Sequence, residues 1–380
     1  MRRLSTLSLL GLALLLPGAA LASALSKPLR ARTPAAAGGT VVLENLAGSL
    51  QVLAGKGGEV VLTGTVYSEA DSPTGSQALL DAVAVEVRRE GSRATLHVAY
   101  PVEKAPFRYR DGKEHGASWW GHSSSTVEYQ GRRVKVTEGG GGSPLLYVDL
   151  RLEVPPGVTV EVTNHLGRVE ARGVGADVEV KTASADVAAD DVAGRLKVKT
   201  GSGDARVDGS GGLELSTGSG DVAAERVRGD VRISTGSGDV RLGRSEGGKV
   251  SVTTGSGDVA LDDVAGSLEV QTGSGDIEGR ALREVERLEV GTGSGEVSLS
   301  LDASRLVGGE VEAASGDVSL YLASPPALTL SVSTASGDID AESLPGTRVA
   351  KRSERRLEAE VQGGGAPLRI HTASGNVRVR

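Results

Sequence analysis

The sequence predicts an all-β fold, a single-stranded parallel β-solenoid (β-helix) with coils of about 18 residues. Three observations support this prediction. Segments that read T-G-S-G-D-V return at a nearly constant spacing, apolar residues alternate with polar ones beside them, and glycine makes up 55 of 380 residues, roughly twice its usual share of ~7%. A right-handed winding is favoured, because parallel β crossovers are right-handed in nearly all folds.

The chain begins with the three parts of a secretory signal peptide. Arg2 and Arg3 form a basic start, the apolar run LSLLGLALLL covers 7–16, and Ala20-Leu21-Ala22 forms an A-x-A cleavage site. We therefore predict a signal peptide over 1–22, cleavage after Ala22, and a periplasmic or secreted protein. The apolar run is short for a membrane span, so no transmembrane segment is expected after signal removal.

Charge and cysteine content narrow the possible partners. The net charge is −7 with acidic and basic residues interspersed, which argues against a nucleic-acid partner. The sequence contains no cysteine, so neither a lipid anchor on cysteine nor a disulfide is expected in spite of export. Stability must therefore come from apolar burial and backbone pairing.

The repeat is measured on the threonine that opens each motif. These threonines follow one another at intervals of about 18 residues, and a period of this length predicts stacked coils. Ala313, Thr334 and Thr372 continue the series at wider intervals. The opening threonines are Thr163, Thr182, Thr200, Thr217, Thr235, Thr254, Thr272 and Thr292.

One unit, TGSGDVALDDVAGSLEVQT over 254–272, shows the predicted internal structure. Val259 and Leu261 alternate with polar residues, as do Leu268 and Val270, and this period of two is typical of half-buried strands. Glycines lie between the two strands, where tight corners need backbone angles that glycine adopts easily. Each coil is therefore predicted to hold two short strands and two corners, around a narrow core of aliphatic residues.

The repeat also gives a domain organisation. The segment GTVVLENLAGSLQV over 39–52 aligns without a gap with GDVALDDVAGSLEV over 257–270, so the solenoid is expected to begin near Gly39. We predict, in chain order, a linker, an N-terminal solenoid part with longer coils and an aromatic and basic loop, and regular repeats with a charged insertion that forms a helix or a hairpin. Their ranges are 23–38, 39–162 with the loop over 101–146, and 163–380 with the insertion over 343–368.

Three of these features together resemble a known family. An early coil at 39–52, the junction VDLRLEVPPGVTVEV over 148–162, and the repeated S-G-D-V units are similar to the bacterial "putative adhesin" family of β-strand repeat proteins, a domain of unknown function. The sequence is also similar to the head domains of "putative autotransporter adhesins". The most specific positions are Pro155, Pro156, Gly157, Val158, Gly167 and Val169. The resemblance implies a β-solenoid outside the cytoplasm and implies no reaction, cofactor or catalytic residue.

An acidic residue follows the corner of nearly every coil. If the coils stack in register, these carboxylates form a column that a cation such as calcium could neutralise. The favoured interpretation is structural, with each carboxylate bonded to the backbone N–H groups of its own turn. The column comprises Asp186, Asp204, Asp221, Asp239, Asp258, Asp276, Glu296, Asp317 and Asp338.

Six of the nine aromatic residues gather in the irregular segment 100–129, together with several basic residues. Exposed aromatic side chains on a loop beside a rigid scaffold often bind sugars or proteins, and the binding residues would be Trp119, Trp120, Tyr109 and Arg108. The alternative, which the composition favours, is a lid over the open end of the solenoid. His115 and His122 lie close together in the same loop, and chance proximity is favoured there over metal binding.

No sequence motif for catalysis stands out, and no metal or cofactor is expected. We therefore predict a non-catalytic protein with a structural or adhesin-like binding role, which presents a loop or a repeat face to an envelope protein or polysaccharide. The alternative is an enzyme that acts on a polysaccharide through paired carboxylates on the same scaffold, which would need a groove with carboxylates from different coils about 5–10 Å apart.

Overall fold

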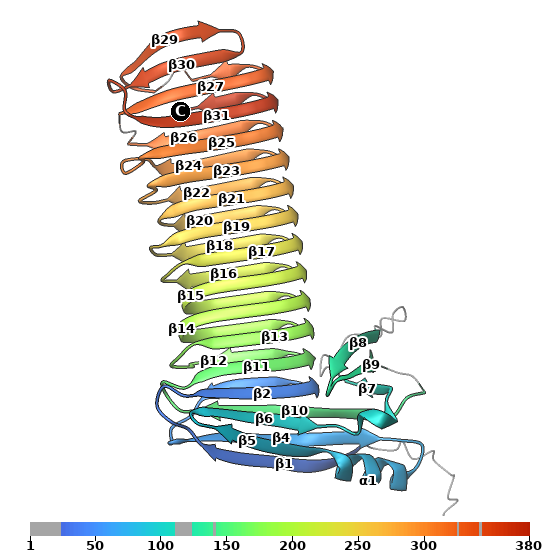
Figure 1. Ribbon diagram of the computed structural model, residues 1–380. Helices are drawn as coiled ribbons and strands as arrows, with labels where there is room; N and C mark the ends of the chain where they lie inside the picture. The colour runs from blue at the N-terminus through green and yellow to red at the C-terminus, as the bar shows by residue number, and fades with distance from the viewer. Residues whose placement is uncertain (1–23, 111–123, 140–141, 325–326, 342–343) are drawn as a thin grey trace, which may run out of the picture.

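The computed structural model describes residues 24–110, 124–139, 142–324, 327–341 and 344–380, and it shows a long rod of stacked β-coils (Figure 1). The predicted fold class is confirmed: strands dominate, and nearly all strand pairs along the rod are parallel. The predicted signal peptide lies outside the described residues. Within the described ranges, no helix is long and apolar enough to cross a membrane.

Each coil contributes one strand to each of two sides of the rod. Side 1 holds the strands that lead into the T-G-S-G corner, and side 2 holds the strands that follow the acidic residue. Strands β14 (Val187–Ser202) and β15 (Ala205–Ser219) are long enough to run over both sides of their coils. The other strands of side 1, in spatial order, are β2 (Thr40–Ala47), β11 (Thr159–Leu166), β13 (Val178–Ser184), β17 (Val231–Ser237), β19 (Lys249–Ser256), β21 (Ser267–Ser274), β23 (Arg287–Ser294), β25 (Gly308–Ser315), β31 (Ala366–Ser374) and β27 (Leu328–Ser336). Those of side 2 are β3 (Leu50–Ala54), β12 (Val169–Arg172), β16 (Val222–Val227), β18 (Val240–Ser245), β20 (Val259–Val264), β22 (Ile277–Leu282), β24 (Val297–Asp302), β26 (Val318–Ala323), β32 (Val377–Val379) and β28 (Ile339–Asp340).

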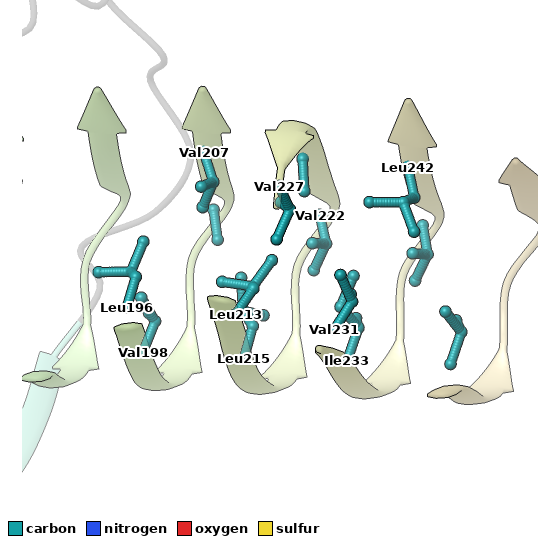
Figure 2. Close-up of a cluster of buried hydrophobic side chains, with 14 of the residues drawn as sticks. Leu196, Val198, Val207, Leu213, Leu215, Val222, Val227, Val231, Ile233 and Leu242 are labelled. Carbon is teal, nitrogen blue, oxygen red and sulfur yellow. The ribbon is translucent and has the colours of Figure 1, made fainter. Parts of the chain in front are cut away.

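The core is a narrow column of aliphatic side chains between the two sides. Leu213 pairs with Val231 and Leu215 with Ile233 on side 1, and each of these four side chains is at most 2% exposed. Figure 2 shows the same layer repeating along the rod, with side 2 residues such as Leu242 facing it. Because adjacent strands lie only about 4.8 Å apart, each buried side chain packs directly on its equivalents in the neighbouring coils, and these layers hold Val, Leu, Ile and Ala.

The register corrects one detail of the predicted alignment. Thr163 pairs with Lys181 and not with Thr182, so the first coil is one position shorter than the threonine spacing indicates, and Asn164 lies level with Thr182. Asn164 in turn pairs with Asn45. Both asparagine side chains are fully buried, and the Nδ2 group of Asn45 donates to Oδ1 of Asn164 at 2.8 Å, so the pair satisfies part of its own hydrogen bonding inside the core.

The N-terminal end is closed by antiparallel strands, which corrects two expectations. On side 2, β10 (Leu145–Val154) pairs with β3 and then antiparallel with β4 (Glu59–Glu69), which pairs antiparallel with β1 (Leu25–Pro34). The predicted linker over 23–38 is therefore largely a strand. On side 1, β6 (Arg93–Ala99) follows β2 and pairs antiparallel with β5 (Ala84–Glu90).

The described residues between 59 and 154 thus form a cap of mainly antiparallel strands with the helix α1 (Pro73–Ala82) and a 3-10 turn over Val102–Lys104, and not a set of longer coils. Antiparallel pairing reverses the strand direction, so a further parallel coil cannot continue the pattern. The outermost strand on side 1, β5, carries exposed charges at Glu86, Arg88, Arg89 and Glu90, which hinder edge-to-edge association.

A small lobe of three strands leans against this cap (Figure 1). It comprises β7 (Phe107–Tyr109), β8 (Ser124–Tyr129) and β9 (Arg132–Glu138), with β8 antiparallel and β7 parallel to β9. Phe107 and Tyr129 are fully buried within it. Most aromatic side chains of the described part of this segment therefore serve a local core, which is consistent with a covering role.

At the C-terminal end, the order of the strands in the sheet differs from their order in the chain. Strand β31 comes last but one in the sequence, yet it lies between β25 and β27 and pairs parallel with both. On the other side, β32 lies likewise between β26 and β28. The charged insertion forms a hairpin, β29 (Thr347–Ser353) with β30 (Arg356–Val361), which decides between the two alternatives of helix and hairpin. Because β30 pairs antiparallel with β27, this end of the stack is also closed by a reversed strand.

Truncation of one core side chain tests the stack. We expect Ile233→Ala to lower the free energy of unfolding by about 2–5 kcal/mol, because Ile233 is 1% exposed and the coils above and below cannot close the cavity. Arg232→Ala on the same strand is exposed and should stay within about 0.5 kcal/mol of wild type. Urea unfolding followed by circular dichroism measures both variants, and equal midpoints would contradict the tightly packed column.

Candidate functional site

The T-G-S-G corner is a structural device. The opening threonine points inward, and its hydroxyl donates to a carbonyl of the coil below, as from Thr272 to Gly257 at 3.1 Å. At Thr217 and Thr235 the hydroxyl is buried and has no such partner among the described residues. A Cβ atom on Gly257 would lie 2.1 Å from the carbonyl oxygen of Gly238, so the second glycine is required by the close approach of successive corners.

The acidic residue after the corner links one coil to the next. The backbone N–H of Asp276 donates to Oδ1 of Asp258 at 2.9 Å, and the N–H of Asp258 donates to Oδ1 of Asp239 at 3.1 Å. The same bond joins the predicted acidic residues from Asp186 to Glu296. The expectation that each carboxylate bonds its own turn is therefore wrong, because the nearest free N–H groups belong to the coil above.

The far end of this ladder shows that charge is not needed for the bond. The coil inserted out of order carries Asn376 at the acidic position. Its N–H donates to Oδ1 of Asp317 at 2.7 Å, and its own Oδ1 accepts the N–H of Asp338 at 3.0 Å. Across the described ranges, no group of three or more histidine, aspartate or glutamate side chains is arranged to hold a metal ion.

The predicted binding residues of the aromatic loop lie in two different places. Trp119 and Trp120 fall outside the described residues, as do His115 and His122. Tyr109 is 6% exposed. Arg108 is largely covered and donates from Nε to the Ser143 carbonyl at 2.8 Å and from Nη2 to Oε1 of Glu69 at 3.1 Å. Tyr109 and Arg108 thus pack and anchor the small lobe instead of projecting from it.

The structure brings together a cluster that spacing in the sequence does not reveal. Glu44 on β2 lies between two histidines from neighbouring strands, with Oε2 at 3.1 Å from Nδ1 of His97 and Oε1 at 3.4 Å from Nε2 of His165. Gln130 of the small lobe contacts the other ring nitrogen of His97 at 3.0 Å. Tyr129 stacks on His97 and meets the ring of His165 edge-on.

This Glu44 cluster joins the cap, the first two coils and the small lobe. Hydrogen bonds from the two histidines lower the pKa of Glu44 from its ordinary value of 4.5 to about 2, and the bond from His165 has a larger effect than the bond from His97. Burial opposes the shift, because it favours the neutral acid. An open depression of about 500 Å³ lies beside the cluster and includes Glu86, Arg88 and Thr95 in its lining. The contacts use both ring nitrogens of His97 and Nε2 of His165, so the cluster is best explained as a clamp between the parts that it joins.

Side 2 carries an exposed aromatic residue near the C-terminal end of the rod. Tyr321 on β26 is 57% exposed. Its neighbours across the strands are Ser300 on β24 and, at the next level, Ser298 and Ser319. These small side chains leave an open depression of about 220 Å³ beside the ring. We name this surface the Tyr321 patch, and its polar and aromatic lining comprises Tyr321, Ser298, Ser300, Ser319, Glu278, Arg280, Arg378 and Arg380.

The three arginines make the Tyr321 patch basic. Arg280 forms an ion pair with Glu278 on its own strand. Arg378 and Arg380 share one carboxylate, that of Asp340, at 3.8 and 3.6 Å. Three guanidinium groups therefore face two carboxylates, and the side chains of all three arginines are more than half exposed. Ion pairs this exposed are weak, so the guanidinium groups can be recruited by a ligand.

Side 1 carries an acidic depression on the coils of the same region. Its volume is about 420 Å³. It lies over Gly291, which has no side chain and so leaves a gap among the outward-facing side chains of β23. Glu289 pairs directly with Glu310 across β23 and β25, and Glu312 lies further along β25 on the same face. His371 on β31 completes this lining. The two sides of the rod thus differ in charge over the same coils.

Sequence reasoning missed the Tyr321 patch. The arginines at 378 and 380 are far from Tyr321 in sequence and come beside it only because β32 inserts next to β26. The Glu44 cluster was missed for a similar reason, since its residues come from four segments spread over 121 positions. For the Tyr321 patch, the signal in the sequence was Tyr321 itself, an aromatic residue within repeats that otherwise contain none.

The aspartate ladder gives the next testable prediction. We expect Asp258→Ala to cost about 0.5–1.5 kcal/mol of unfolding free energy, because it leaves the Asp276 N–H without its acceptor. Asp258→Asn keeps an acceptor oxygen, as Asn376 does naturally, and should lie close to wild type. Thermal melting of the three proteins with and without calcium provides the measurement. A calcium-dependent rise in melting temperature that both variants lose would indicate a cation site instead.

The Glu44 cluster predicts a pH-dependent contribution to stability. Because its pKa is lowered in the folded state, the contribution of Glu44 is fully present above about pH 4.5 and is lost as the pH falls towards 2. We expect Glu44→Gln to cost about 1–2 kcal/mol at pH 7, a figure reduced for a side chain that is 37% exposed, and less at pH 3. Urea unfolding at both pH values measures this. A cost that stays constant between them would contradict the assigned role of the carboxylate.

Comparisons with known proteins identify the family of the repeat region. A comparison with curated proteins found no match. Two crystal structures are similar over most of the chain: a "putative cell adhesion protein" from Clostridium sporogenes, with 11% identity, 93% of this chain and 99% of that chain covered and a TM-score of 0.18, and a "putative adhesin" from Bacteroides fragilis, with 10% identity, 93% and 97% covered and a TM-score of 0.23. These scores are too low to support an argument. The family model for Toastrack DUF4097 matches residues 194–320 and 307–380. The repeat region over 194–380, about half of the chain, therefore belongs to the Toastrack DUF4097 family.

Proposed function

We propose that this protein is an exported, non-catalytic binding protein that works as a stiff rod and presents the Tyr321 patch to a partner at the cell envelope. The observation that carries the proposal is a tyrosine 57% exposed on the regular coils of side 2, where the other large apolar residues that the structure describes are turned inward. Tyrosine and arginine are the residues most enriched where binding energy concentrates. Export rests on the sequence of residues 1–22.

The scaffold supports passive presentation. The residues of the Tyr321 patch sit on four adjacent strands, β22, β24, β26 and β32, whose backbones are bonded to one another. Arg380 directly follows β32, and its backbone bonds to Leu320 and Leu322 of β26. Their spacing is therefore set by the main chain and needs no rearrangement on binding. A preorganised surface loses little conformational entropy when it binds, which raises affinity without additional contacts.

Cosedimentation with envelopes isolated from the producing cells tests this proposal. We expect Tyr321→Ala to reduce the bound fraction at least fivefold. Arg206→Gln combined with Arg232→Gln removes two exposed charges elsewhere on the rod and should bind like wild type. Equal binding of Tyr321→Ala and wild type would contradict the proposal. A parallel variant with Trp119→Ala and Trp120→Ala tests the aromatic loop, for which binding stays a prediction from the sequence.

One observation favours a second candidate function. Glu289 and Glu310 face each other across neighbouring coils in the acidic depression of side 1, and two carboxylates from different coils are what a polysaccharide-cleaving enzyme on this scaffold requires. The depression is open and lies on a flat side, so it would hold a sugar chain only from one face. Release of reducing ends from envelope polysaccharide by wild type, and its loss in Glu289→Gln and Glu310→Gln, would establish this function instead.

A further inference from the structure

We infer that the Tyr321 patch binds a linear anionic polysaccharide, one that carries carboxylate or phosphate groups along its chain. This inference rests on the proposed function and names the class of its partner. Three observations support it: the size of the patch, the charge around it, and the fact that the strands beneath it already pair with a neighbour on both sides.

The size of the patch suits a linear chain better than a folded protein. Four strands about 4.8 Å apart span about 14 Å across the patch, and two outward positions on one strand span about 7 Å. A stable interface with a folded protein buries about 800 Å² on each partner, which a strip of this size cannot supply. A narrow polymer crossing the strands would contact Tyr321 and the arginines with only a few of its units.

The charge of the patch selects an anionic partner. Among the side chains that the structure describes, Arg378 and Arg380 share one carboxylate, that of Asp340, at 3.8 and 3.6 Å, which is longer than a good charge-assisted hydrogen bond. A carboxylate or phosphate group can offer each guanidinium a shorter, two-point contact. Arg380 lies level with Tyr321 on the neighbouring strand, since Leu320 pairs with Val379, so an anionic group and a ring bound to the tyrosine would be adjacent.

The strands below the patch argue for a sugar chain and against an extended acidic peptide. Peptides that bind to sheets in extended form usually add a strand to a free edge, because their main chain then finds hydrogen-bonding partners. Strands β24 and β26 have a neighbour on both sides, so no main-chain partners are free there. A sugar ring instead offers an apolar face to Tyr321 and hydroxyl groups to Ser298, Ser300 and Ser319, which are exposed or half-buried.

Dextran derivatives test this inference, because they vary charge on one backbone. Carboxymethyl dextran, phosphorylated dextran, plain dextran and poly-glutamate are immobilised, and binding of the full chain is measured by surface plasmon resonance. We expect at least one charged dextran to bind at least tenfold more tightly than plain dextran and than poly-glutamate, and to weaken as salt rises. The two charged forms distinguish a carboxylate from a phosphate as the recognised group.

Two sets of variants locate the binding. Tyr321→Ala, and Arg378→Gln combined with Arg380→Gln, should each lower the affinity at least tenfold. The control pair Arg206→Gln and Arg232→Gln should leave it unchanged, and thermal melting confirms that all variants fold. Binding unaffected by the patch variants, equal binding of plain dextran, tighter binding of poly-glutamate, or no binding of any polymer would each overturn the inference. If the envelope experiment succeeds while these fail, the patch binds another partner and the proposed function stands.

Discussion

The stacking of each coil on the next, in register and about one strand spacing away, is the constraint on which the rest of this structure depends. It brings Leu213 over Val231 and Leu215 over Ile233, and therefore makes the core a narrow column of stacked aliphatic side chains. It also brings successive corners so close that a Cβ at Gly257 would meet the carbonyl of Gly238 at 2.1 Å. The composition of the repeat follows from these two distances.

A stack of parallel strands has two open ends, and antiparallel strands close the N-terminal end on both sides and the C-terminal end on side 1. At the N-terminal end, β10 and β6 are followed by the antiparallel strands β4 and β5. At the C-terminal end, the hairpin of β29 and β30 pairs antiparallel with β27. Reversal of strand direction ends the parallel series, and charged edge residues discourage further pairing. The insertion of β31 between β25 and β27 adds a coil within this closed end, so the hairpin remains outermost.

Function, in such a rod, is confined to the outward positions. The inward residues form the core, and the corner residues hold one coil to the next, as the bond from Asp276 N–H to Asp258 shows. The outward residues of the regular coils do not have these structural roles, and their identities differ from coil to coil. Side 1 gathers Glu289, Glu310 and Glu312, while side 2 gathers Tyr321 and three arginines over the same region. The regular coils thus act as a frame on which exposed side chains are placed at set distances.

The sequence by itself determined the all-β class, a coil length of about 18 residues, the two strands that a coil holds and the inward positions, because strand periodicity and glycine corners are local properties of the chain. It also left the charged segment after residue 343 correctly open between a helix and a hairpin. Only the tertiary structure decided that residues 25–34 form a strand, that β31 lies between β25 and β27, and that Glu44 meets His97 and His165. It also decided that Arg378 and Arg380 lie beside Tyr321. These are pairings between segments distant in the chain, and no local pattern of residues specifies which distant strand fills a given edge.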